Sequence, residues 1–124
     1  SPMSPAALLA IVSKAQALIA DATRWAERHF AEDANGTWAP VGSERATRFN
    51  LAGALIRSAG PSAREAMSAL EQLLATAPRG PGAITLRYAS GLTHEQALEL
   101  LGWSIRQLES AAMRAAGGWR DATS

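Results

Sequence analysis

The feature that most constrains this chain is a pair of helix-start signals near its C-terminal end. They lie in residues 92–115, whose sequence is LTHEQALELLGWSIRQLESAAMRA. Thr93 can cap a helix, and Gln96 stands at the third position that completes a capping box. Ser104 repeats this arrangement with a glutamine three residues on, and Gly102 between them is a typical helix end. The spacing predicts two short helices joined by a tight turn, which is a helix-turn-helix arrangement.

The N-terminal part has the pattern of a long amphipathic helix. Ser4 followed by Pro5 is a strong helix start, because serine caps a helix and proline suits its first turn. Apolar residues then recur at steps of three and four, which predicts a helix as far as about Phe30. These residues are Leu8, Leu9, Val12, Ala15, Ile19, Ala22 and Ala26. Such a helix could bridge the domain, or its free end could serve as a partner surface.

Two further helices are predicted before residue 78. Ser43 can cap the first and Gly60 can end it, and Gly53 in its middle permits the close approach of another helix. Its buried face is predicted to contain Thr47, Phe49, Leu51, Ala52, Leu55 and Ile56, and its basic, solvated side Arg45, Arg48 and Arg57. Ser62 and Glu65 form a capping box that begins the second helix. The core stripe of that helix is predicted to be Met67, Leu70, Leu73 and Leu74.

Residues 32–42 break the helical pattern. They contain Asn35 and Gly36, a pair favoured in tight hairpin turns, and Pro40, which confines a strand to a sheet edge. The sequence leaves both a short hairpin and a plain loop open for this segment.

These patterns predict an all-α fold class, a compact bundle of five to six helices that ends in a helix-turn-helix-like pair. At 124 residues, the chain is expected to form a single helical domain over 1–124. A run of proline and glycine at 78–82 predicts a joint between an N-terminal helical part, 4–77, and a helix-turn-helix-like part, 83–116. Within the latter, 83–89 is expected to form another short helix.

Composition restricts the function classes. The absence of cysteine excludes disulfides and thiolate metal sites, which suits a cytoplasmic protein. No apolar run approaches the roughly 20 residues of a membrane span, so no membrane partner is expected. The histidines, His29 and His94, lack the spacing of a zinc-binding helix, and no phosphate-binding loop or nucleophile motif is present. The sequence therefore predicts no metal, no cofactor and no catalytic residues.

The C-terminal part also carries a series of residues in one ungapped register. They are Leu86-Arg87-Tyr88, Gly91-Leu92-Thr93, Glu95, Leu100-Leu101-Gly102, Ser104 and Arg114-Ala115. On these residues the segment resembles the fourth conserved region of bacterial sigma factors and the helix-turn-helix modules of response regulators. The resemblance implies that a helix from Ser104 enters the DNA major groove. The residues that would then face bases and phosphates are Arg106, Gln107, Ser110 and Arg114.

A second group of residues spans most of the chain. It comprises Arg24-Trp25, the turn 33–36, the segment 46–55 (ATRFNLAGAL) and the segment 91–95 (GLTHE). On these residues the chain resembles a family of small bacterial proteins known only as a domain of unknown function. This resemblance implies a single helical domain with no activity, in which 92–115 is ordinary core helix.

Three functions remain open from the sequence. The first is a cytoplasmic, DNA-binding transcription-regulatory protein with double-stranded DNA as its partner. Against it, four arginines balance four acidic residues from residue 83 onward, whereas DNA-binding domains usually carry a basic face. The second is a non-enzymatic helical protein–protein interaction module, including a homodimer, that uses the N-terminal helix and exposed Trp103 or Trp119. The third is an enzyme or small-ligand binder with a pocket between helices.

Overall fold

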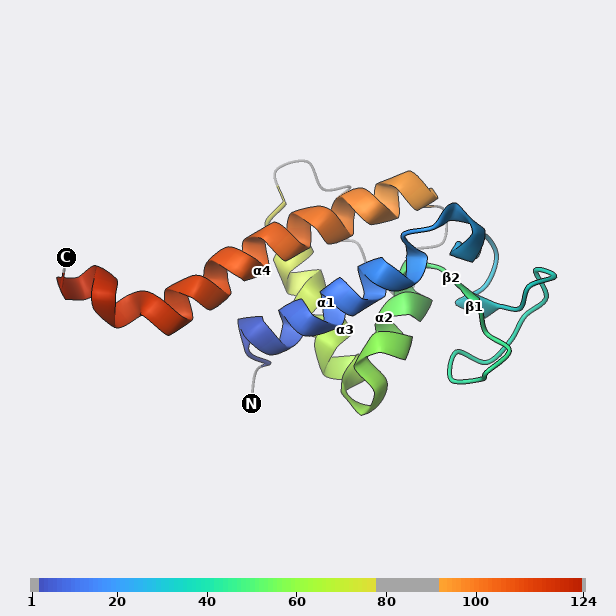
Figure 1. Cartoon of the computed structure of the whole chain (residues 1–124), viewed down its shortest axis with the longest axis horizontal. Coiled ribbons are helices and arrows are strands. Elements are labelled where there is room, and N and C mark those ends of the chain that lie inside the picture. The colour runs from blue at the N-terminus through green and yellow to red at the C-terminus, as the bar shows by residue number, and fades with distance from the viewer. Residues whose placement is uncertain (1–2, 78–91, 124) are drawn as a thin grey trace.

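The structure is a computed structural model in which residues 3–77 and 92–123 are described, with side chains as far as residue 117 (Figure 1). The helices of this part are α1 (Pro5–Ile19), α2 (Leu51–Ala59), α3 (Ala63–Leu74) and α4 (His94–Thr123). Two 3-10 turns, η1 (Ala22–Arg24) and η2 (Gly60–Ser62), and two short strands, β1 (Ala31–Glu32) and β2 (Arg48–Phe49), complete it. No helix in these residues is both long and apolar enough to cross a membrane.

The predicted all-α bundle of five to six helices is wrong. The described residues contain four α-helices and a small antiparallel sheet, in which Ala31 pairs with Phe49 and Glu32 with Arg48. α1 lies between α4 and α2, and α3 contacts all three of these helices (Figure 1). The core between these helices includes Leu8, Val12, Ala15, Ile19, Leu51, Ala54, Leu55, Ala66, Leu70, Leu74, Ala97, Leu101 and Leu108.

α1 begins as predicted, because the Ser4 hydroxyl accepts a hydrogen bond from the backbone N–H of Ala7 at 3.2 Å. It ends at Ile19, about ten residues before the predicted end near Phe30. Asp21 stops it by capping η1, where its carboxylate accepts a hydrogen bond from the backbone of Thr23. The apolar spacing that continues beyond this point therefore does not belong to the helix.

Residues 20–50 fold through backbone pairing between distant positions. The N–H of Ala26 donates to the carbonyl of Phe49, and the N–H of Asn50 donates to the carbonyl of Phe30. The predicted tight turn is present, with Gly36 at a φ of 80° and Asp33 bonded to Thr37 across it. The segment is neither a full hairpin nor a plain loop. The turn makes a single β-bridge, from Glu32 to Trp38, and the strand β1 pairs with β2 instead.

α2 is shorter than predicted, because Asn50 rather than Ser43 caps it. The Asn50 side chain accepts a hydrogen bond from the N–H of Gly53 at 2.8 Å, whereas Ser43 caps a turn by accepting from Arg45. Gly53 does permit a close approach, but of a loop: a Cβ at this position would overlap the carbonyl oxygen of Phe30. Gly60 ends the helix as predicted, with a φ of 57°.

The predicted basic side of α2 is only partly solvated. Arg57 Nη1 donates to the carbonyls of Val41 and Ser43, at 2.7 and 3.0 Å. Arg48, which precedes the helix on β2, donates from Nη2 to the carbonyl of Ala34 at 2.8 Å. Both arginines therefore fasten residues 33–47 to the body of the protein.

The predicted helix-turn-helix pair is wrong, because α4 runs without interruption through Gly102. The first capping box is confirmed by hydrogen bonds in both directions between Thr93 and Gln96, at 2.9 and 3.1 Å. Ser104 is no cap, since its buried hydroxyl donates back to the carbonyl of Leu100 at 2.7 Å, as serine does inside a helix. A glycine in a helix costs about 1 kcal/mol relative to alanine, which the burial of neighbouring Leu101 offsets. The predicted joint at 78–82 and short helix at 83–89 lie outside the described residues.

Candidate interaction surface

α4 is anchored at its first residue to the last turn of α1. His94 Nε2 donates a hydrogen bond to the carbonyl oxygen of Ile19, which α1 itself leaves without a helical partner. The His94 ring also packs against Trp25, with ring centroids 5.4 Å apart and planes tilted by 44°. This anchor fixes where α4 starts, and from there the helix runs antiparallel to α1.

The first half of α4 covers α1 over its whole length. One face of this half is buried: Ala97, Leu101, Ser104 and Leu108 are at most 5% exposed. Residues 94–108 and α1 each contain fifteen residues and rise about 22 Å, so α4 passes the start of α1 just after Leu108.

The second half of α4, residues 109–123, extends beyond the body of the protein, and we name it the α4 extension (Figure 1). Its exposed side chains, among those described, are Glu109, Ser110, Met113, Arg114, Ala115 and Ala116, and Met113 is 75% exposed. Ala112 and Ala115 follow Leu108 at steps of four and three, so they continue the same helix face. The face that α1 covers in the first half is thus left open in the second.

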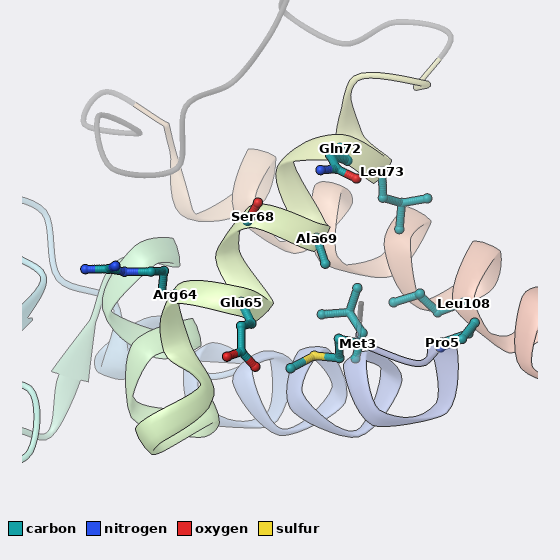
Figure 2. Close-up of a pocket in the computed structure, with 10 residues that line it drawn as sticks. Met3, Pro5, Arg64, Glu65, Ser68, Ala69, Gln72, Leu73 and Leu108 are labelled. Atoms are coloured by element: carbon teal, nitrogen blue, oxygen red, sulfur yellow. The ribbon is translucent and has the colours of Figure 1, made fainter. Parts of the chain in front are cut away.

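A groove lies at the point where the α4 extension leaves the body. This cavity of about 460 Å³, which we name the end groove, is bordered by the start of α1, by α3 and by Leu108 of α4 (Figure 2). Its apolar lining is Met3, Pro5, Leu8, Ala69, Leu73 and Leu108, and its polar lining, exposed on α3, is Arg64, Glu65, Ser68 and Gln72. An apolar floor with a polar rim suits an amphipathic helix.

The four residues predicted to contact DNA all lie on α4 with exposed side chains: Arg106, Gln107, Ser110 and Arg114. They do not lie on a separate recognition helix, because no turn divides α4. Arg106 folds back along its own helix, with Nη1 3.5 Å from the position a Cβ on Gly102 would take and near Gln16 of α1. Glu109 is exposed on the same stretch. DNA contact by these residues stays a prediction.

Trp103 and the N-terminal helix were the other predicted contact surfaces. Trp103 is half-buried against the core, and α1 is covered by α4, α2 and α3. The side chain of Trp119 lies outside the described residues. The free helix end that the sequence suggested at the N-terminal helix therefore belongs to α4.

A buried carboxylate that the sequence reasoning missed lies beside β1. Glu32 is 4% exposed, and its Oε2 accepts hydrogen bonds from the N–H of Arg28, at 3.2 Å, and from His29 Nδ1, at 2.9 Å. These bonds close the bend that leads into the strand. In the part of the chain with described side chains, no cluster of three or more acidic or histidine residues could hold a metal ion.

Comparison of the chain with known protein families, with curated proteins and with solved structures finds no match. Both sequence resemblances therefore stay predictions, and the features that bear on function are the surface of α4 and the end groove.

Proposed function

We propose that this protein is a non-enzymatic helical interaction module whose docking element is the α4 extension. The observation that carries the proposal is the open face of this helix. Leu101 and Leu108 are buried on that face, whereas Ala112, which continues it, is half-buried and Ala115 is exposed. A helix face with this pattern is stabilised when another protein supplies the missing layer.

The low intrinsic stability of the α4 extension supports this function. Isolated helices of about 12–15 residues are marginal in water. Gly117 and Gly118 lower the helix propensity further, by about 1 kcal/mol each relative to alanine. Helical packing against a partner would supply the free energy that α1 supplies to the first half.

The chemistry of the α4 extension favours a protein over nucleic acid as its partner. Its described side chains carry one negative charge, on Glu109, and one positive charge, on Arg114. Phosphate binding requires a surplus of basic residues, which this surface lacks. Alanines at steps of three and four allow two helix backbones to approach closely.

The proposal is tested with a photo-crosslinking amino acid at Ala115, in the native host, and with the same amino acid at Glu44 as the control. Both side chains are exposed, but Ala115 lies on the open face of α4 and Glu44 lies on the loop before β2. We expect irradiation to give a discrete protein adduct at 115 and none at 44. Mass spectrometry identifies the adduct, and mixing the purified components must then reproduce it.

An absence of adducts at 115, or equal adducts at both positions, would overturn the proposal. Fluorescence anisotropy with a labelled mixed-sequence duplex, at two salt concentrations, examines the alternative function. Salt-sensitive binding that Arg106→Ala and Arg114→Ala abolish would replace the interaction module with a DNA-binding protein.

A further inference from the structure

We infer that the partner of the α4 extension is a second copy of this chain. In this dimer the two α4 helices run antiparallel across a twofold axis near Ala112, and each extension reaches the end groove of the other copy. The inference deepens the proposed function and rests on it.

The two uncovered surfaces, the open face of the α4 extension and the end groove, meet on one molecule. Leu108 belongs both to the last covered turn of α4 and to the lining of the end groove. A helix that packs antiparallel on the open face, past Ala115 and Ala112, therefore arrives at the end groove. Its path resembles that of α1, which packs antiparallel on the same face of the preceding half.

A dimer with twofold symmetry covers the open face and the end groove of both copies at once. Each copy offers one projecting helix and one groove, and an isologous interface pairs the helix of each copy with the groove of the other. An unrelated partner would have to supply both a helix for the groove and a surface for the extension. A second copy supplies both without any further element.

The end groove and the α4 extension each carry balanced charges. The polar side of the end groove carries one cation, Arg64, and one anion, Glu65, both exposed on α3. The α4 extension likewise carries one of each, Glu109 and Arg114. None of the four forms an ion pair within the described residues, so all are available across the interface without an excess of like charge.

The dimer would bury enough area for a specific interface. Half of the lateral surface of a helix about 22 Å long and about 10 Å wide is roughly 350 Å². The two extensions cover each other over about half of their length and the end grooves over the rest, so the two copies together bury roughly 1,050 Å². A specific interface needs about 1,000 Å² or more, so this arrangement is sufficient for a weak but specific dimer.

The first experiment measures mass by sedimentation equilibrium for the full chain, for Ala112→Asp and for Ser110→Asp. Both variants add one carboxylate to the α4 extension, but Ser110 lies on the face opposite Leu108. We expect the unaltered chain and Ser110→Asp to be dimers. Ala112→Asp should dimerise about 100-fold more weakly, because each copy buries an unpaired charge.

The second experiment uses the absence of cysteine in this chain. Ala115→Cys and Ala69→Cys are prepared separately and mixed under oxidising conditions. We expect a mixed disulfide between the α4 extension of one copy and the end groove of the other. Replacing Ala69→Cys with Glu44→Cys in the mixture should remove that product, because Glu44 lies on a loop outside the groove lining.

The outcomes separate this inference from the proposed function. A monomer at all concentrations whose position 115 still crosslinks to a different protein overturns the dimer and leaves the interaction module standing. A monomer without adducts at 115 overturns both. A dimer that Ala112→Asp does not weaken, or that gives no mixed disulfide, overturns the arrangement of α4 and the end groove.

Discussion

The two halves of α4 share one helix and one apolar face, yet only the first half has a layer beneath it. Leu101 and Leu108 are buried on α1, whereas Ala112 is half-buried and Ala115 exposed. The sequence marks the same face in both halves, but leucine changes to alanine at the point where α4 passes the first residue of α1. An amphipathic pattern thus shows which face requires cover, while the length of the neighbouring helix decides whether the chain itself supplies it.

The largest expected effect comes from removing a buried side chain in the covered half. Leu101→Ala should lower the free energy of unfolding by about 2–5 kcal/mol, because it leaves a cavity in the core against α1. Urea unfolding followed by circular dichroism measures the loss. Met113→Ala in the α4 extension is the control, with an expected change within about 0.5 kcal/mol. Equal losses at the two positions would show that both halves contribute alike to the core.

The next effect concerns the anchor between α1 and α4. His94→Ala should lower the free energy of unfolding by about 1–3 kcal/mol, since it leaves the carbonyl of Ile19 without its donor and removes the contact with Trp25. Thermal unfolding compares it with Glu99→Ala, an exposed position on the same helix. A result for His94→Ala no larger than that for Glu99→Ala would contradict the role of the anchor.

A smaller effect distinguishes one continuous helix from two. Thr93→Ala removes a helix cap and should cost about 1 kcal/mol of unfolding free energy. Ser104→Ala should cost less than about 0.5 kcal/mol, because the Ser104 hydroxyl only bonds back to its own helix. Denaturant unfolding of the two variants side by side measures the difference. Equal costs would mean that Ser104 also caps a helix, which is the arrangement the sequence predicted.

The starts of α1 and α4 were more predictable than their lengths, whereas the capping box predicted for α3 is absent, because Ser62 makes no side-chain cap bond. Ser4 and Thr93 cap their helices as the sequence indicates, because capping depends on residues only three positions apart. The early end of α1 follows from Asp21, whose carboxylate caps η1, and the backbone beyond η1 then pairs with Phe49, which lies far along the chain. Ala26 is fully buried, so its apolar character was correctly recognised, but it serves the segment beside β2 rather than a helix.

The candidate surface was predictable only in part, for a related reason. The sequence singled out residues 92–115, which lie in and just before α4, but it took Gly102 as a break. The low helix propensity of glycine is visible in the local sequence. The packing of Leu101 and Leu108 against α1, which stabilises the continuous helix, is not visible there. The open face after Leu108 was not predictable, because it follows from where α1 begins in space.

The smallest expected effect lies at the other side of the junction between α1 and α4. Hydrogen bonds from the backbone and then the hydroxyl of Thr23 lower the pKa of Asp21 below its ordinary 3.8, with smaller contributions from Arg24 and His94. A lowered pKa in the folded state stabilises the protein above the unfolded value, and this stability is lost as pH falls through the folded pKa. Because the carboxylate is exposed, solvent screens the effect and keeps it small.

Asp21→Asn should therefore lower the melting temperature slightly near neutral pH, and the difference from the unaltered chain should disappear at strongly acidic pH. Scanning calorimetry from about pH 7 to about pH 3 measures it, with Glu44→Gln as a control on an exposed loop residue. A difference that stays constant over this range would mean that the Asp21 charge does not contribute. The cap at η1 would then act through its geometry alone, and the covered half of α4 would depend on His94 and the core face for its position.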